Sequence, residues 1–422
     1  MSSLDEARTE ENHNQVMHTT EELEKKAYWR INLPVLWLAV FLCCASYTSS
    51  VPFLPVYVYR DLGVAQENVN FWAGLCFAVT FLGCTIMAPY WGALADHVGQ
   101  RKMAMRAGYG LAITYFLTGA CQDVYQLLGV RTLCGLVAGF VPACMSMASS
   151  SLPESRMGWG MGLMQTSMAT GGIMGPLLGG YMASWFGIRM SFFIGSIALF
   201  AGATAVTFIV KDLTILQKGS VSAMSLFRDL KESLANNELR FIMFMFFMIQ
   251  TCVMTIQPLI TMYVGELMGE MGDEAVKMSG VIFSLAGFAG IIAAPFWGKR
   301  GQSYGFVKIF ALVTFSAGII NLFQIFIQDV WQFAAIQFVY GIFLAGAVPN
   351  INANLTMVTD KTTRGKAFGL STSANQFGGV VGPLLGGVLG ALMNTRYVLV
   401  IEGCILICMG IYAYYSRVRQ KM

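Results

Sequence analysis

Two charged side chains, Arg131 and Glu402, lie inside long apolar stretches of the sequence. If those stretches cross a membrane, each charge costs about 2.5 to 3.5 kcal/mol, so it should face a cavity or a partner. Glu402 could carry a proton by titrating, or it could simply be hydrogen-bonded within its own helix bundle. Arg131 could face a cavity, or its long side chain could extend to the membrane interface. Asp61 and Asp123 are weaker candidates for a titrating group.

Patterns typical of enzymes and of metal sites do not occur in the sequence. Its three histidines, His13, His18 and His97, have no nucleophile-base or metal-ligand spacing, and its ten cysteines form no CxxC pair. It also has no G-x-x-x-x-G-K-[ST] loop with which to use ATP. We therefore predict no catalytic residue, no metal, no cofactor and no disulfide framework.

The composition identifies the class of protein. With 56% hydrophobic residues, 12% charged residues and a mean hydropathy of +0.60, the 422-residue chain is too apolar for a soluble protein of this length. Stretches of about 20 apolar residues, enough to cross a bilayer, recur along it. The predicted spans are 33–56, 71–93, 103–121, 124–148, 159–184, 189–210, 241–264, 278–298, 306–327, 331–357, 367–392 and 396–415.

Basic residues predict how these spans are oriented. Of the 27 Lys and Arg residues, 22 fall on the side that carries both termini and only four on the other side. Basic loops stay in the cytoplasm during insertion, so both termini are expected there, with the chain in the plasma membrane. The basic residues are spread over many short turns, which makes nucleic-acid binding a poor interpretation.

The chain contains two copies of one sequence unit. VPFLPVYV at 51–58 matches QPLITMYV at 257–264, APYWG at 88–92 matches APFWG at 294–298, and QDVYQ at 122–126 matches QDVWQ at 328–332. These pairs are 206 residues apart, and the spacing becomes 207 for GGIMGPLLGG at 171–180 and GGVVGPLLGG at 378–387. Such a constant offset indicates duplication. The predicted fold is therefore all-α, with twelve transmembrane helices in two six-helix bundles.

The duplication also sets the predicted domain bounds. They are a cytoplasmic tail at 1–30, a six-helix bundle at 31–210, a cytoplasmic linker at 211–240, a second six-helix bundle at 241–416 and a short tail at 417–422. Two bundles with a single interface can rock against each other.

The second and third spans are joined by GALADHVGQRK, residues 92–102, in which Gly92 and Gly99 suit a tight bend. This loop resembles the G-x-L-A-D-R-x-G-R-K signature of the major facilitator superfamily, and six-plus-six duplication is that family's architecture. The resemblance implies a conformational latch formed by Gly92, Asp96, Gly99, Arg101 and Lys102, in which Asp96 bridges to the other half. The second copy has Gln302 in place of the aspartate, so the latch should be one-sided. The alternative is a loop whose charges only set the orientation of the helices in the membrane.

Two further features resemble the drug:proton antiporters of this family. An arginine at the position of Arg131 is associated there with proton coupling, and GPxxGG in the fifth helix resembles their antiporter motif. Glycines at four-residue spacing allow close helix approach, and in the family the fifth and eleventh helices lie between the halves. The expected hinge and interface residues are Gly171, Gly175, Pro176, Gly179, Gly378, Gly382, Pro383 and Gly386.

Neutral polar side chains within the spans are candidates for the substrate cavity. They are Tyr47, Gln165, Gln250, Gln257, Asn350, Asn354, Asn375 and Gln376. The alternative is that they bond helices to one another. Together they suggest a permissive, neutral hydrogen-bonding cavity.

The resemblance implies a secondary transporter, not an enzyme, that works as a monomer in the lipid bilayer. We expect it to export small amphipathic or lipophilic compounds by alternating access in exchange for protons. Export of one specific metabolite, such as a sugar or a metal-chelating compound, is the alternative, followed by uptake. A receptor or scaffold would not require two matched halves.

Overall fold

The computed structural model describes residues 28–50, 52–212, 236–270, 272–359 and 364–418, and all regular structure within them is helical. The N-terminal half contains Tyr28–Ser50, α2 (Leu54–Arg60), α3 (Gln66–Val98), α4 (Gln100–Ala120), α5 (Val124–Val137), α6 (Phe140–Ser151), α7 (Met157–Phe186) and α8 (Ile188–Ile209). The C-terminal half contains α10 (Asn237–Ile256), α11 (Ile260–Met268), α12 (Asp273–Tyr304), α13 (Phe306–Leu322), α14 (Val330–Leu344), α15 (Ala347–Val358), α16 (Arg364–Leu392) and α17 (Thr395–Ala413).

Nine helical stretches in the described part of the chain are long and apolar enough to cross a membrane. The other three predicted spans coincide with α4, α7 and α16, which have 21, 30 and 29 residues and are long enough to cross. The first of these begins with three basic residues within its first seven, and the other two are rich in glycine, which lowers their hydropathy. The architecture therefore agrees with the twelve predicted spans.

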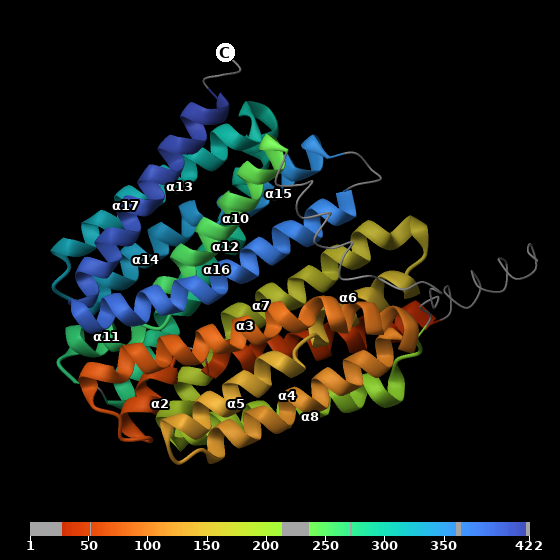
Figure 1. Ribbon diagram of the computed structural model, residues 1–422, viewed down its shortest axis with the longest axis horizontal. Coiled ribbons are helices and arrows are strands. Elements are labelled where there is room, and N and C mark those ends of the chain that lie inside the picture. The colour runs from red at the N-terminus through yellow and green to blue at the C-terminus, as the bar shows by residue number, and fades with distance from the viewer. Residues whose placement is uncertain (1–27, 51, 213–235, 271, 360–363, 419–422) are drawn as a thin grey trace, which may run out of the picture.

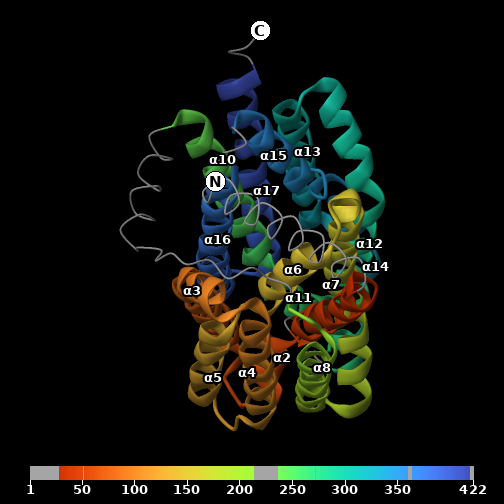
Figure 2. The same cartoon turned by 90° about the vertical axis from the view of Figure 1, so that its right-hand side faces the viewer.

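The helices form two bundles, one from each half of the chain (Figure 1). Separate hydrophobic cores lie within them: Phe140 and Phe192 are buried in the N-terminal bundle, and Phe310 and Phe333 in the C-terminal bundle. The bundles meet along two helix pairs, α3 with α16 and α7 with α12. We call the end where α8 finishes and α10 starts the linker end, and the opposite end the far end. Figure 2 looks onto the linker end.

Four of the predicted spans, each expected as a single span, are broken in the structure. The breaks separate Tyr28–Ser50 from α2, α5 from α6, α10 from α11, and α14 from α15. Gly139, with φ of 130°, lies at the second break, and Gly346 lies at the fourth. Proline, which cannot donate a backbone hydrogen bond, adjoins the first and third breaks at Pro52 and Pro258. Such interruptions occur where backbone lines a cavity or is buried in protein.

The bend between α3 and α4 corrects one prediction. It is made by Gly99 alone, which has φ of 100° and ψ of 145°, and Gly305 makes the equivalent bend between α12 and α13 with φ of 97°. These values favour glycine because a Cβ would be strained there. Gly92 was expected to share the bend, but it lies inside α3, where the helix continues unbroken to Val98.

The glycine rows of α7 and α16 also differ from expectation. Gly171 packs against Cys44 of the first helix, where an added Cβ would lie 2.7 Å from the Cys44 Cβ, and Gly382 would meet the Thr251 carbonyl of α10 at 2.6 Å. Gly175, Gly179, Gly378 and Gly386 face the same two helices. The rows therefore allow close packing within each bundle. The prediction that they lie between the bundles was wrong.

The interface between the bundles uses the neighbouring face of the same two helices. An added Cβ on Gly280 of α12 would overlap the Pro176 carbonyl, and one on Gly74 of α3 would overlap the Pro383 carbonyl. Gly180 and Gly387 lie beside the same contacts. The two prolines of the repeated GPLLGG segment thus lie at the interface, whereas the glycine rows do not.

Candidate functional site

A cavity of about 670 Å³ lies in the N-terminal bundle and reaches the α16 helix of the other bundle. Its lining extends from Tyr47 and Tyr115, deep in the helices, to Ala95 and Gln100 beside the bend at the linker end. Gln376 of α16 contributes from the C-terminal bundle. The volume is in the range of sites for small organic ligands. The cavity therefore extends from the middle of the N-terminal bundle towards the linker end, and α16 of the other bundle closes part of it.

Arg106 supplies positive charge to this cavity. Its guanidinium donates to the Val137 and Ala138 carbonyls at 3.2 and 3.3 Å, at the break between α5 and α6, and lies 3.6 Å from the centre of the Trp91 ring. Trp91 in turn donates to the Leu136 carbonyl at 2.7 Å. No Asp or Glu occurs among the described residues that line the cavity. Its electrostatics therefore disfavour a cationic ligand.

The predicted cavity residues are distributed over several environments. Only Tyr47 and Gln376 line this cavity. Asn375 donates to Gln250 at 3.3 Å and so joins α16 to α10. Asn350 is fully buried and donates to the Gly346 carbonyl at 2.7 Å, which satisfies backbone at the break between α14 and α15.

The other three predicted residues do not line this cavity. Gln165 is exposed on α7, Gln257 lies at the break between α10 and α11, and the Asn354 amide nitrogen is buried without a hydrogen-bond partner among the described residues. All eight remain predictions as ligand contacts.

Sequence reasoning missed several lining residues. Arg106 lies inside the predicted span 103–121, and a basic residue within a span is a signal that could have drawn attention to it. The thiols of Cys43, Cys44, Cys84 and Cys134 also line the cavity. Cysteine in an apolar span gives no such signal, because it behaves there as a small apolar residue.

Arg131 of α5 is buried in the core of the N-terminal bundle, with 2% of its surface exposed. Its guanidinium lies over the rings of Phe192 and Tyr115, 5.5 and 5.9 Å from their centres. Within the described part of the chain, its Nε and Nη2 atoms have no hydrogen-bond partner. The arginine does not extend to the membrane interface, and the aromatic faces compensate only part of its charge.

Glu402 of α17 is 1% exposed in the core of the C-terminal bundle. The Tyr340 hydroxyl donates to its Oε1 at 2.7 Å, and the Asn321 amide donates to its Oε2. Gln324 donates to the Asn321 side-chain oxygen, which extends the network. Glu402 is therefore hydrogen-bonded within its own bundle, and the same network could hold a titrating carboxyl.

Three polar contacts join the bundles at the far end, and Ser284 of α12 also donates to the Ile173 carbonyl of α7 at 2.7 Å, nearer the middle of the helices. Arg60 forms an ion pair with Asp273 at 2.7 Å, Thr261 donates to the Pro52 carbonyl at 2.6 Å, and Asn70 donates to the Gly390 carbonyl at 2.9 Å. Each contact joins one half of the duplicated chain to the other.

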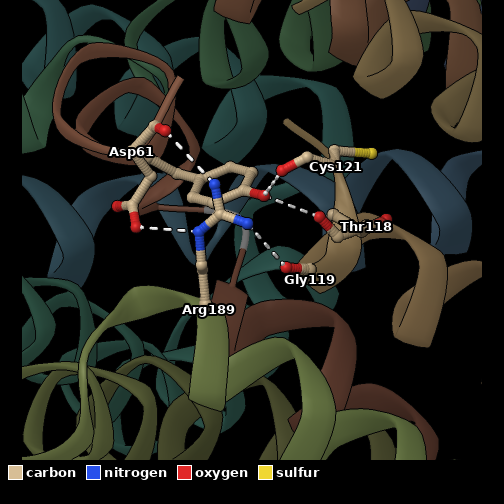
Figure 3. A network of polar contacts seen from close by, with 6 residues as sticks. Asp61, Thr118, Gly119, Cys121 and Arg189 are labelled. Atoms are coloured by element: carbon tan, nitrogen blue, oxygen red, sulfur yellow. Dashed lines mark hydrogen bonds and ion pairs between the residues drawn. The ribbon is translucent and has the colours of Figure 1, made fainter. Parts of the chain in front are cut away.

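Asp61 and Asp123 have structural partners at the same end of the molecule. Arg189 donates to the Asp61 carboxylate at 3.2 Å and to the Gly119 carbonyl at 3.3 Å, which joins α2, α4 and α8 (Figure 3). Asp123 accepts hydrogen bonds from the Tyr125 and Gln126 backbone amides and so caps α5.

The expected latch residues at the linker end bond within the N-terminal bundle where the structure describes them. The Arg101 amide donates to Asp212 at 2.9 Å, and its guanidinium bonds the Thr207 carbonyl of α8. Lys102 is exposed. The Asp96 side chain lies outside the described part of the structure. A bridge from this loop to the other bundle stays a prediction.

A family model and individual sequences that resemble this chain point to the same family. The model of the Major Facilitator Superfamily matches residues 36–305 and 270–421. The chain is 33% identical over 398 residues to the multidrug resistance protein MdtG of Yersinia enterocolitica, covering 93% of this chain and 95% of that protein. It is equally similar to MdtG of Salmonella typhimurium, of which it covers 97%.

Solved structures show the same fold at low sequence identity. The peptide transporter POT in complex with alafosfalin aligns with a TM-score of 0.75 and 13% identity, covering 94% of this chain and 98% of the other. The nucleoside transporter NupG aligns with a TM-score of 0.75 and 14% identity, covering 92% and 99%. The twelve-helix fold is thereby confirmed. The chain is a multi-pass membrane transporter, not an enzyme, and belongs to the Major Facilitator Superfamily.

Proposed function

We propose that this transporter exports small lipophilic compounds by alternating access, in exchange for protons. The observation that carries the proposal is the cavity that extends towards the linker end, combined with bundle contacts at the far end. If the linker end is cytoplasmic, this is an inward-facing state that loads substrate from the cell. The relatives named multidrug resistance proteins support efflux as the direction.

The lining of the cavity supports a preference among lipophilic substrates. Trp91, Tyr47 and Phe140 offer apolar and aromatic surface, and Arg106 adds a fixed positive charge. With no carboxylate among the described lining residues, neutral and anionic compounds are favoured over lipophilic cations. Substituting Arg106→Gln should reduce export of an anionic dye more than export of a neutral dye of similar size.

Glu402 is the proposed proton carrier. Both of its described partners donate to it, so protonation turns one carboxyl oxygen into a donor, and Tyr340 or Asn321 must reorient. That reorientation would change the packing of α14 and α13 against α17. Arg131 in the other bundle would keep a fixed positive charge near the cavity, since its neighbour Tyr115 is part of the lining.

Dye accumulation in cells that lack their own exporters tests the proposal. Cells expressing the chain should exclude the dye, a proton uncoupler should abolish exclusion, and Arg131→Ala and Glu402→Gln should each abolish it. Lys299→Ala, an exposed cation outside the cavity lining, is the matched control and should leave exclusion intact. Exclusion that survives both the uncoupler and Glu402→Gln would refute proton exchange.

A further inference from the structure

A second cavity, of about 590 Å³, lies on the outside of the C-terminal bundle and belongs to none of the features above. It is a groove between the end of α12, the start of α13 and the end of α17. Figures 1 and 2 both place α13 and α17 on the side of this bundle away from the N-terminal bundle. The groove therefore faces the surroundings of the molecule and not the space between the bundles.

The floor of the groove is apolar and its mouth is basic. Phe296, Leu312 and Phe315 are exposed apolar side chains along it. Arg300 and Lys308 are exposed in its lining, and there is no Asp or Glu among the described lining residues. A buried ligand with an anionic head and an apolar tail matches this distribution of charge.

Among the described residues, aromatic rings and not a carboxylate contact Arg300. Its guanidinium lies 5.3 Å from the centre of the Phe296 ring and 5.6 Å from that of Tyr304. Its one hydrogen bond to another described residue goes to the Tyr304 hydroxyl at 3.3 Å. The remaining donors of the guanidinium can bind a phosphate in two-point fashion, which suits an oriented arginine.

The depth of the groove corresponds to one leaflet of a bilayer. Trp297 lies seven residues before Tyr304, and Phe315 lies nine residues after Phe306, which places them about 10 and 13 Å inside the helix ends at 1.5 Å per residue. Half of a hydrocarbon core of about 30 Å is about 15 Å. The basic mouth would face the phosphate head group of a phospholipid, and the apolar floor would face its acyl chains.

The equivalent place in the N-terminal bundle has different side chains and contacts. Tyr109, which corresponds to Phe315 at the 206-residue offset, hydrogen-bonds Thr204 and Thr207 of α8 at 3.3 and 3.2 Å. Arg101 also bonds the Thr207 carbonyl. These polar contacts join α4 to α8, whereas deeper in the groove α13 carries the apolar side chains Leu312 and Phe315. At the same offset Arg300 corresponds to Leu94, so the pair of basic residues at the mouth is not repeated in the N-terminal bundle.

We propose that this groove binds an anionic phospholipid from the leaflet at the linker end. The phosphate lies between Arg300 and Lys308, and an acyl chain runs along Leu312 and Phe315 towards Trp297. The lipid would lie against α12, whose other face packs on α7 of the N-terminal bundle. It can thereby stabilise the C-terminal bundle beside the interface that alternating access must rearrange.

Lipid binding to the purified full chain tests this proposal. Native mass spectrometry with phosphatidylglycerol and phosphatidylcholine should show preferential binding of the anionic lipid. Arg300→Gln combined with Lys308→Gln should lower that affinity about tenfold or more, because each cation near a lipid surface contributes about 1 kcal/mol. Lys299→Gln, next in sequence but outside the groove lining, should leave it unchanged. Equal loss in both variants, or equal binding of the two lipids, overturns the proposal.

A second measurement needs no change of charge and so does not depend on how the double variant folds. Phosphatidylglycerol with brominated acyl chains should quench tryptophan fluorescence, and Trp297→Phe should remove a part of that quenching. Brominated phosphatidylcholine should quench less at the same concentration. Quenching that is identical in the Trp297→Phe variant places the lipid elsewhere and rejects the groove. Neither readout depends on transport, so failure here leaves the proposed function intact.

Discussion

In the N-terminal bundle the buried charge is Arg131, surrounded by aromatic faces and with two guanidinium nitrogens lacking a partner among the described residues. In the C-terminal bundle the buried charge is Glu402, which accepts hydrogen bonds from Tyr340 and Asn321. One bundle thus contains a charge whose burial is poorly compensated, and the other a charge inside a polar network. A poorly compensated charge is costly to keep, which points to a functional reason for it.

Because the chain is duplicated, each of these buried charges has an equivalent position in the other bundle, and the two can be compared directly. Arg131 corresponds to Gln337 and Tyr115 to Asn321 at an offset of 206, and Glu402 corresponds to Gly195 at an offset of 207. Each bundle therefore has its charge on a helix where the other bundle has a neutral residue. The two copies keep the backbone plan and have diverged in the polar chemistry of their cores.

The largest expected effect on stability comes from Glu402→Ala. It leaves the buried Tyr340 hydroxyl and Asn321 amide without their acceptor, so the free energy of unfolding should fall by about 2 to 4 kcal/mol. Denaturant unfolding of the purified protein in detergent measures this. Glu402→Gln keeps an acceptor for one of the two donors and should cost less; equal losses would show that the network is unimportant for stability.

Arg131→Met should behave in the opposite way. Removing a poorly compensated buried charge should raise the free energy of unfolding by about 1 kcal/mol, while uncoupler-sensitive transport falls at least about tenfold. The same unfolding assay and a dye-efflux assay measure the two quantities. A loss of stability as large as that of Glu402→Ala would mean that Arg131 has an effective partner, and the contrast between the bundles would fail.

A matched tyrosine pair tests the comparison at smaller scale. Tyr57 and Tyr263 are equivalent in the duplication, but the Tyr57 hydroxyl donates to the Thr118 carbonyl at 2.8 Å, whereas the buried Tyr263 hydroxyl has no partner among the described residues. Tyr57→Phe should lower the free energy of unfolding by about 1 kcal/mol, and Tyr263→Phe should change it little or raise it slightly. Equal effects in the unfolding assay would contradict this difference.

The smallest effect is expected at the ion pair that joins the two bundles at the far end. Arg60 and Asp273 are both exposed, with 39% and 53% of their side-chain surface accessible. Asp273→Asn should therefore lower the free energy of unfolding by at most about 1 kcal/mol. High salt should reduce even this effect. Accessibility labelling of a cysteine placed at the far end should rise slightly in the variant. A large rise would show that this single pair holds the far end closed.

Much of the fold could be predicted because it depends on local patterns. The twelve spans follow from apolar length, and the repeated GPLLGG, APxWG and QDVxQ segments reveal the duplication. Their position in apolar stretches singled out Arg131 and Glu402, but it left open whether the Arg131 side chain extends to the membrane interface, and the structure shows that it is buried. Only nine helices of the described chain combine spanning length with high hydropathy, because glycines and basic residues lower the hydropathy of the other three.

The candidate site was predicted less well because it depends on which helix faces meet. Tyr47 and Gln376 line the cavity, but Asn350 satisfies a broken helix instead, and Arg106 was overlooked. A polar residue in a span can face a cavity or a neighbouring helix, and its type does not distinguish the two.

The sequence by itself determined that this chain crosses the membrane as two copies of one helical unit, because length, hydropathy and repetition are properties of each segment. Only the tertiary structure decided that Gly175 and Gly382 face their own bundles while Pro176 and Pro383 lie between the bundles. A helix presents several faces at once, and which face meets which neighbour is set by packing among segments far apart in the chain. The groove beside Arg300 exists for the same reason.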